Sequence, residues 1–365
     1  MRKISFSYFA LVDELRSPGV VKKINNTIVA AQRKKCVTKK NIFGTNFKGV
    51  TRFIVKLSLT KSDIVMIRFS DLIAPINFFL ILLLRIRGKK IVIDVPTPRS
   101  IGLKEIETSI SNPILRHIRK LISYLSGSWV LLPANIIVQY AEESWWFKFG
   151  LSYKTIKMGN GILIDENAKL TKATWPDIEL NLIGVAQLAK WHGYDRLLRA
   201  LSLIKDRHIN YSIKLTIVGE GGAYNDLKIL KEELELDNVI FTGRLTGKKL
   251  DAIYEKAHIG VASLGLYRIG LNEASVLKAR EYMAKGLAVI AAGRDPDFYK
   301  DCPYRFLVPN SDDINKLASL LTSFDLNNSV PKPGEVRAYA EENLSLESKL
   351  DKIFKRLMKD DKKTV

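Results

Sequence analysis

Short apolar runs alternate with longer segments whose apolar residues recur every three or four positions along this 365-residue chain. Runs of the first kind are typical of buried strands, and segments of the second kind are typical of helices that cover a sheet. In the first half the pattern predicts strands near residues 4–12, 52–56, 64–69, 91–95 and 135–139. In the second half it predicts strands at 180–186, 213–218, 238–241, 259–263 and 287–291, and helices at 193–206, 223–235, 247–256 and 274–284. This alternation predicts an α/β protein with parallel sheets.

The chain length and one polar segment predict two domains. Residues 165–177 are polar, contain Pro176 and are typical of a linker. We therefore expect one domain over 1–165 and a second over 178–334. A last helix is expected over 335–359, after a break at prolines 331 and 333.

One apolar run, residues 72–84, raises the question of a membrane span. It has thirteen residues and contains Pro75 and Asn77, whereas a span needs about 20 residues. We expect a buried helix here. The N-terminus, interrupted by acidic residues, is expected to form a first strand and not a signal peptide.

Charge is unevenly distributed along the chain. Residues 1–150 carry 25 Lys and Arg against 9 Asp and Glu, a net +16, while the whole chain is +20, which leaves +4 for the rest. Such a basic half predicts an anionic partner: a membrane surface, a pyrophosphate-linked acceptor or nucleic acid. The two cysteines, Cys36 and Cys302, and the four histidines lack metal-ligand spacing, so no metal is expected.

The most informative segment is 260–293, which holds two acids between two apolar runs. Glu273 and Glu281 lie eight apart, and the intervening residues are expected in the helix over 274–284. Eight helical residues rise about 12 Å, more than the roughly 5–9.5 Å between the paired acids of a glycosidase. That span matches the two ends of a sugar nucleotide, with cations such as Lys278 left for the diphosphate. The alternative is an exposed helix that merely carries charges.

The arrangement E(273)ASVLKARE(281)YMAKGLAVIA resembles the family-four retaining glycosyltransferases of the GT-B fold. Four further segments resemble motifs of that family in the same order. They are KMGNG at 157–161, LIGVAQLAKWHGYD at 182–195, KLTIVGEGG at 214–222 and NVIFTGR at 238–244. The resemblance implies two Rossmann-like parallel-sheet domains facing across a cleft. It also implies that the last helix packs back on the first domain.

The resemblance implies a role for each matched position. Glu273 would face the transferred sugar and Glu281 the nucleotide ribose, while Gly219 and the turn at Gly243 and Arg244 would admit the nucleotide. Glu273, together with Lys278 and Lys190 beside the diphosphate, would form the catalytic set. Gly19, between the first strand and its helix, is a candidate for acceptor or phosphate contact.

The chain departs from the family pattern at two places. Gln187 and His192 stand where the phosphate loop usually carries Arg and Lys, so neutralisation of the diphosphate would fall to Lys190, Lys278 or Arg268. The segment IVIDVPTP, 91–98, lacks the histidine that often follows the fourth strand, and its role is not transferred to Asp94 or Thr97.

The expected function is transfer of a sugar, with retention, from a nucleoside diphosphate donor to a glycan or lipid-linked glycan. We expect cell-surface polysaccharide synthesis, no metal or other cofactor, and no nucleic-acid partner. The protein would act in the cytoplasm, peripherally on the anionic inner face of the cell membrane. The alternatives are a sugar-nucleotide epimerase of the same fold, a nucleic-acid-binding protein and an inactive scaffold.

Two weaker motifs have ordinary structural interpretations. Asp295-Pro-Asp297 is literally the D-x-D metal signature of the other glycosyltransferase fold, but it follows a buried strand and a glycine, which favours a turn. The aromatic cluster 145–149 is expected to pack in the core or at a domain edge, with a membrane-interface patch as the lesser interpretation.

Overall fold

The computed structural model describes residues 3–165, 169–172, 179–298, 302–324 and 331–361. The chain forms two compact units: unit 1 is Met1–Leu163 with Leu346–Val365, and unit 2 is Ile164–Ser345. Most of the predicted linker lies outside the described residues. Its described part bonds to unit 2, where the amide of Thr171 donates to the carbonyl of Lys285 over 2.9 Å.

Unit 1 is built on a six-stranded sheet of order β2-β1-β3-β4-β5-β6, in which all described pairings are parallel. The strands are β1 (Ser5–Leu11), β2 (Val37–Phe43), β3 (Ile64–Arg68), β4 (Lys90–Val95), β5 (Ile136–Gln139) and β6 (Thr155–Lys157). The helices are α1 (Pro18–Arg33), α2 (Phe47–Ser58), α3 (Ala74–Ile86), α4 (Arg99–Ser109), α5 (Pro113–Leu125), α6 (Trp145–Lys148) and α13 (Leu346–Asp361).

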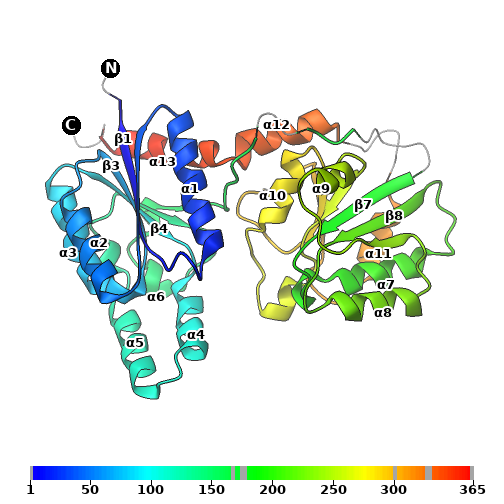
Figure 1. Cartoon of the computed structure of the whole chain (residues 1–365), viewed down its shortest axis with the longest axis horizontal. Helices are drawn as coiled ribbons and strands as arrows, with labels where there is room; N and C mark the ends of the chain where they lie inside the picture. The colour runs from blue at the N-terminus through cyan, green and yellow to red at the C-terminus, as the bar shows by residue number, and fades with distance from the viewer. Residues whose placement is uncertain (1–2, 166–168, 173–178, 299–301, 325–330, 362–365) are drawn as a thin grey trace. The chain divides into compact units, whose positions relative to one another are not determined.

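Helices cover both faces of this sheet, and β1 shows why (Figure 1). Phe6, Tyr8 and Ala10 pack with α1 and α13 on one face, and Phe9 and Leu11 pack with α2 and α3 on the other. Successive side chains of a strand point to opposite faces, so a strand buried on both faces is apolar throughout. This two-sided burial explains the apolar run that predicted the strand.

The strand predicted at 52–56 is wrong, because these residues lie inside α2. Their apolar side chains have helical spacing: Phe53 and Leu57, four residues apart, are buried on one side of the helix. Asn46 caps the helix by accepting a hydrogen bond from the amide of Gly49 over 2.8 Å. A short apolar run does not by itself separate a strand from a helix.

The apolar run 72–84 forms a short turn and then α3, with Pro75 in the first helical turn. The helix is buried on one side only, through residues such as Leu80 and Leu84. Phe79 and Ile86 are 66% and 77% exposed, so the expectation of a buried helix holds for one face alone. Among the described residues, no helix is long and apolar enough to cross a membrane.

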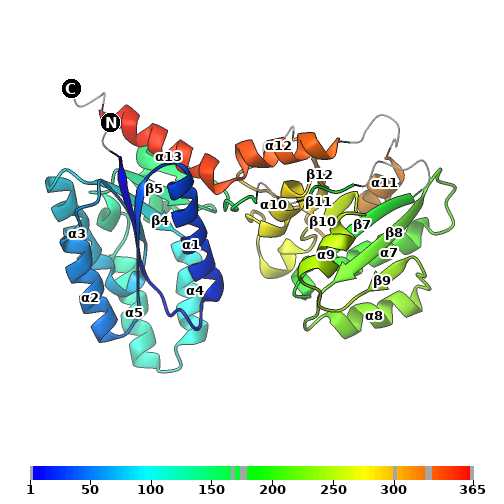
Figure 2. The same cartoon turned by 45° about the horizontal axis from the view of Figure 1, so that its top comes forward.

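The C-terminal segment forms two helices, so the prediction of one helix over 335–359 is wrong. α12 (Pro333–Asn343) belongs to unit 2, and α13 belongs to unit 1. At the start of α13 the amide of Leu346 donates to the carbonyl of Ile162 of unit 1 over 2.8 Å. α13 lies beside α1 on the sheet of unit 1 (Figure 2), which agrees with the expected return of the chain.

Unit 2 is built on a second six-stranded parallel sheet, of order β12-β11-β10-β7-β8-β9. Its strands are β7 (Glu179–Val185), β8 (Ser212–Val218), β9 (Val239–Phe241), β10 (Ile259–Val261), β11 (Ala288–Ala292) and β12 (Arg305–Val308). Its further helices are α7 (Tyr194–Ile204), α8 (Tyr224–Glu233), α9 (Gly247–Tyr254), α10 (Leu277–Ala284) and α11 (Asn315–Thr322).

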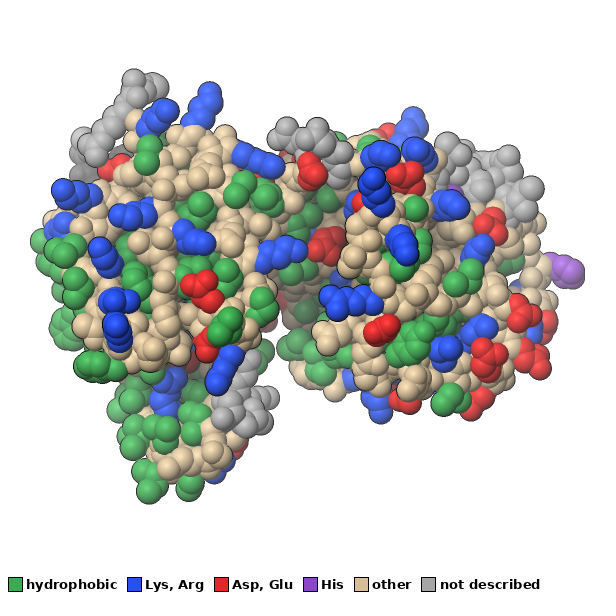
Figure 3. Space-filling view, viewed as in Figure 1, with side chains coloured by type: hydrophobic (Ala, Val, Ile, Leu, Met, Phe, Trp, Pro, Cys, Tyr) green, Lys and Arg blue, Asp and Glu red, His purple; other side chains and the backbone are tan. Residues whose placement is uncertain are grey.

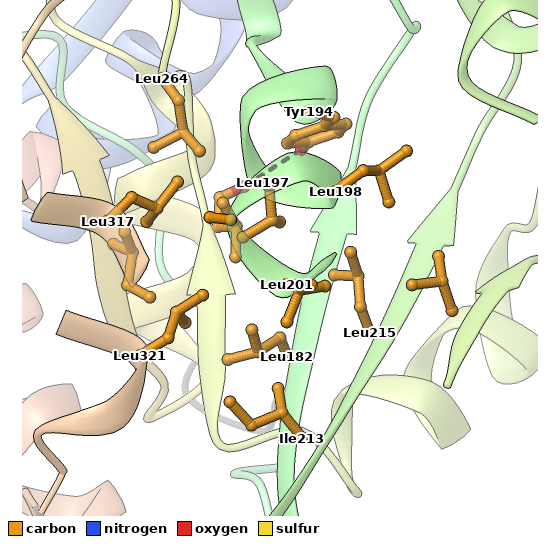
Figure 4. Close-up of a cluster of buried hydrophobic side chains, with 14 of the residues drawn as sticks. Leu182, Tyr194, Leu197, Leu198, Leu201, Ile213, Leu215, Leu264, Leu317 and Leu321 are labelled. Carbon is orange, nitrogen blue, oxygen red and sulfur yellow. Dashed lines mark hydrogen bonds between the residues drawn. The ribbon is translucent and has the colours of Figure 1, made fainter. Parts of the chain in front are cut away.

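The main core of unit 2 lies between this sheet and α7, α8 and α11 (Figure 4). Leu197 and Leu201 of α7 pack against Leu182 and Leu215 of the central strands. Strand order reverses between β7 and β10, since β8 and β9 continue on one side and β11 and β12 on the other. Open parallel sheets bind ligands at the carboxyl ends of their strands at such a reversal.

Candidate functional site

The loops that follow β7 and β10 meet at this reversal. The amide of Leu264 donates to the carbonyl of His192 over 2.9 Å. Gly193 has φ +66°, and a Cβ there would lie 2.8 Å from the amide nitrogen of Gly265. The two loops therefore touch backbone to backbone, and only glycine permits that approach.

The predicted glycine turn after β8 also allows two loops to pack backbone to backbone. Gly219 has φ +124°, and a Cβ would lie 1.8 Å from the carbonyl oxygen of Ala186. Its amide donates to the carbonyl of Gly243 over 2.8 Å, and Arg244 beyond that turn is exposed. The glycine signal in the sequence thus reports contact between the loops after β7, β8 and β9, which together form this edge of unit 2.

The helix with the two acids is shorter than predicted. It begins at Leu277, so Glu281 lies on it while Glu273 lies in the extended segment before it. That segment bridges to Arg294: the amide of Ala274 donates to the carbonyl of Arg294 over 3.0 Å. The bridge pairs Glu273 with Arg294 as in a strand, and the helix begins only at Leu277. The 12 Å rise estimated for eight helical residues therefore does not apply between the two acids.

Lys278, in the first turn of α10, holds a buried ammonium. Its Nζ has no hydrogen-bond partner in the part of the chain that the structure describes. It lies 5.7 Å from the ring centroid of Trp191 and 5.8 Å from that of Tyr194. Burial lowers the pKa of Lys278 to about 7, although Glu281 acts in the opposite direction. An anion bound here would supply the missing partner.

His192 lies next to Lys278 and is buried. Burial, with Lys278 as a second cause, lowers the pKa of His192 to about 3, so the imidazole is neutral at physiological pH. Its Nδ1 accepts a hydrogen bond from the amide of Ala189 over 3.0 Å. The proton is therefore on Nε2, which can donate one neutral hydrogen bond to a ligand. Gln187 and Lys190, on the same loop, are exposed.

Arg268 is already engaged with other groups of unit 2. Its guanidinium makes two hydrogen bonds of 2.7 Å to the carboxylate of Asp195 and one of 2.8 Å to the carbonyl of Lys190. Lys190 and Arg268 line a groove of about 470 Å³ between α7 and α8. Lys278 and Glu281 are not among the described residues that line it, so the structure does not gather all the predicted cations in one pocket.

Arg280 and the D-x-D motif form a buried ionic cluster. The guanidinium, 0% exposed, donates to Asp295 over 2.7 and 2.8 Å and to Asp297 over 2.6 Å. Burial opposes the charge, but the two carboxylates outweigh it and raise the pKa of Arg280. The motif is thus a structural turn. Across the described ranges, no group of three or more potential ligands could hold a metal ion.

Unit 1 contains a second buried ionic cluster, at the end of β4. Asp94 is 0% exposed and lies 3.5 Å from Arg68 and 3.9 Å from Lys23, and Tyr8 donates a short hydrogen bond to it. Burial raises the pKa of Asp94, but Lys23, Arg68 and the tyrosine outweigh this effect and lower it. Gly19 lies within the first turn of α1, and a Cβ there would meet nothing within 4 Å.

Comparison with known proteins agrees with this architecture. Residues 165–342 match the family model described as "Glycosyl transferases group 1". Unit 2 is therefore the donor-side domain of a group 1 glycosyltransferase. The predicted enzyme class is thereby confirmed, and the use of a nucleotide sugar follows from it. A search of proteins with curated functions found no match to this glycosyltransferase.

Several solved structures share the fold of the glycosyltransferase. A glycosyltransferase from Rickettsia africae is 16% identical, with a TM-score of 0.59, and the match covers 97% of this chain and 99% of that one. The lipopolysaccharide outer core galactosyltransferase WaaB is 12% identical, with a TM-score of 0.60 and coverage of 97% and 100%. HepE from Anabaena, solved with UDP-glucose, is 13% identical, with a TM-score of 0.58 and coverage of 97% and 99%. These similarities confirm the predicted GT-B fold.

The buried cluster of Arg280, Asp295 and Asp297 generates a prediction about stability. Arg280→Ala leaves two buried carboxylates without their cation, so we expect the free energy of unfolding to fall by about 3–5 kcal/mol. Urea denaturation followed by circular dichroism measures it. Arg294→Ala is the matched control, because Arg294 is exposed and its bonds to 272–274 are made by its backbone. If Arg280→Ala lowers the free energy of unfolding by less than about 1 kcal/mol, the cluster does not stabilise the position of α10.

Proposed function

We propose that this glycosyltransferase transfers a sugar from a nucleoside diphosphate donor to a hydroxyl of a glycan or lipid-linked glycan, with retention. The observation that carries the proposal is the buried ammonium of Lys278, which stands without a hydrogen-bond partner among the described residues. It lies on the same short helix as Glu281, beside the reversal of strand order. HepE, of the same fold, was solved with UDP-glucose, which supports a uridine nucleotide as the first donor to test.

In this proposal Lys278 holds the donor diphosphate. Negative charge builds on the diphosphate as the glycosidic bond to the sugar breaks, and a fixed cation in a dry site stabilises that charge. The Nε2–H of His192 adds a neutral hydrogen bond, since the imidazole carries no charge at neutral pH. Lys190, Gln187 and Arg244 are exposed and are secondary candidates. Arg268 is a weaker one, because Asp195 already neutralises it.

The two acids bind the neutral ends of the donor. Glu281 is exposed on α10, where a carboxylate can accept hydrogen bonds from both ribose hydroxyls. Glu273, in the extended segment before α10, would orient the transferred sugar. Retention by same-face displacement is what membership in the family implies. It requires no covalent bond to the protein, so neither acid needs to act as a nucleophile.

Unit 1 is proposed to bind the acceptor in cell-surface polysaccharide synthesis, at the inner face of the cell membrane. The net charge of +16 over residues 1–150 favours contact with an anionic membrane. The likeness to WaaB, described as a lipopolysaccharide outer core galactosyltransferase, supports an acceptor of this class. Not every cation is available: Arg33 and Lys34 are paired with Glu347 and Asp351 of α13.

The acids provide the first test. With each sugar nucleotide supplied singly, release of the nucleoside diphosphate identifies the donor. Glu281→Ala should then weaken nucleotide binding, since each charge-assisted hydrogen bond to ribose is worth about 1.5–3 kcal/mol. Glu273→Ala should mainly lower turnover, because the sugar contact strengthens in the transition state. Unchanged activity of both variants at limiting donor would contradict the assignment. Glu232→Ala, at an exposed position of α8 that does not line the groove with Lys190 and Arg268, is the control.

The second test uses the pKa of Lys278. The ammonium is charged below about pH 7 and neutral above it in the free protein, and a bound diphosphate favours the charged form. Affinity for UDP should therefore fall as the pH rises above about 7, and binding there should take up a proton. Calorimetric titrations in two buffers of different ionisation enthalpy measure both effects.

The variants decide which side chain causes this pH dependence. Lys278→Ala should bind UDP more weakly and without the decline above pH 7, and it should cost more affinity than His192→Ala. A larger loss in His192→Ala, or an unchanged pH profile in Lys278→Ala, would assign the phosphate contact to another group.

A further inference from the structure

Helix α5 has its apolar and polar sides inverted with respect to the body of unit 1. Five apolar residues face solvent: Ile114 is 72% exposed, Leu115 50%, Ile118 49%, Leu121 57% and Leu125 66%. The polar side faces inward, where Ser123 is fully buried and the three cations of the helix are half-buried. A helix on a soluble protein normally buries its apolar side.

Polar contacts hold α5 in this orientation. Lys120 pairs with Glu107 of α4 over 3.1 Å, and Arg116 donates to the carbonyl of Glu107 over 3.4 Å. Just beyond the helix, Arg99 donates to the carbonyls of Ser126 and Gly127 over 2.8 and 2.7 Å. Because the inward side is engaged in this way, the apolar side stays available for something outside the unit.

Tryptophans border the apolar side of α5. Trp129 donates its ring N–H to the carbonyl of Leu125 over 2.7 Å, and Trp146 donates to that of Tyr124 over 3.0 Å. Both rings remain partly exposed, and Trp145 is 69% exposed. Of this aromatic cluster, which we expected in the core or at a domain edge, Phe147 is buried and Phe149 is 70% exposed. Rings held at their polar edge and open on their apolar body suit a membrane interface.

The apolar surface continues from α5 to α3. Trp129 packs on Phe78 with ring centroids 5.3 Å apart, and the outward residues of α3 include Phe79, Leu82 and Ile86. Figure 3 shows hydrophobic side chains gathered over both helices. Arg85, in α3, is exposed. Lys148, beside Trp145, is partly exposed. The surface therefore combines exposed apolar side chains with positive charge, part of which, at Lys148, is paired with Glu142 over 3.8 Å.

We propose that the outward side of α5, with Trp145 and Trp146, inserts into the headgroup region of an anionic lipid bilayer. The charge of residues 1–150, net +16, is complementary to such a bilayer, whereas a protein partner would need a matching acidic and apolar surface. The thirteen residues of α5 give a rod of about 20 Å, which lies in the membrane plane and does not cross it. This inference deepens the membrane contact proposed above and does not depend on the donor chemistry.

The test compares two matched pairs of substitutions in the full-length protein. Ile118→Glu with Leu121→Glu places two charges on the outward side of α5. Ile229→Glu with Ile240→Glu does the same at positions of unit 2 that are 58% and 42% exposed. In sedimentation with phosphatidylglycerol–phosphatidylcholine vesicles, the α5 variant should bind roughly tenfold more weakly or worse, while the control should bind as the wild type does. Acyl-brominated lipids should quench wild-type tryptophan emission, a readout that needs no variant.

Three results would overturn the proposal. One is unchanged vesicle binding by the α5 variant together with loss of all binding near roughly 0.5 M salt, which would make attachment purely electrostatic. Another is the absence of quenching by acyl-brominated lipids. The third is a wild-type dimer that becomes a monomer in the α5 variant, which would assign the surface to a second copy of the chain. UDP titration of every variant separates these outcomes from failure of the donor site.

Discussion

The guanidinium of Arg280 fixes helix α10, on which the proposed donor site depends. It is fully buried and bonds to Asp295 and Asp297 in the turn after β11. A buried cation that loses its carboxylate partners is strongly destabilising, so α10 has little freedom to shift away from Asp295 and Asp297. Lys278 lies two residues before Arg280 and Glu281 one residue after it. The contacts of Arg280 therefore also fix where these two side chains lie relative to the sheet. The bridge between Glu273 and Arg294 ties the segment before the helix to the same turn.

The same short helix carries one cation paired with carboxylates and one cation without a hydrogen-bond partner among the described residues. Arg280 has two carboxylates, whereas the buried Nζ of Lys278 has no hydrogen-bond partner among the described residues. Burying an ammonium without a partner costs free energy, and the lowered pKa of Lys278 reflects that cost. The ion pairs of Arg280 hold α10 in place and so keep the ammonium of Lys278 buried. A functional site that is less stable without its ligand than with it is a common compromise in enzymes.

Strands buried on both faces were predictable from the sequence, whereas of the four described edge strands only β9 was predicted. The central strands of both units appear where their apolar runs predicted them. The three strands that were not predicted, β2, β6 and β12, all lie at sheet edges. Edge strands are less apolar, and β2 includes the exposed Lys39 and Lys40. Apolar runs in the sequence therefore indicate which segments are buried more directly than they indicate which segments form strands.

The sequence singled out candidate site residues, whereas the geometry around them comes only from the fold. The two acids and Lys278 were identified from their spacing, yet the bridge that shortens the helix depends on Arg294, a contact that periodicity does not encode. The partner of Asp295 and Asp297 is Arg280, 15 and 17 residues away, and only the fold brings them together. Likewise the outward direction of α5 results from polar contacts with α4 and Arg99. Its amphipathic pattern predicts a helix but not which side is buried.

The central claim is that α10 forms the donor diphosphate site. A crystal structure of the protein with UDP tests it most directly. The account predicts that the diphosphate lies within hydrogen-bond distance of the Nζ of Lys278, at about 2.7–2.9 Å, with the ribose hydroxyls on Glu281. Binding of UDP in the groove between α7 and α8, against Lys190 and Arg268, with the Nζ of Lys278 still without a partner, would contradict it.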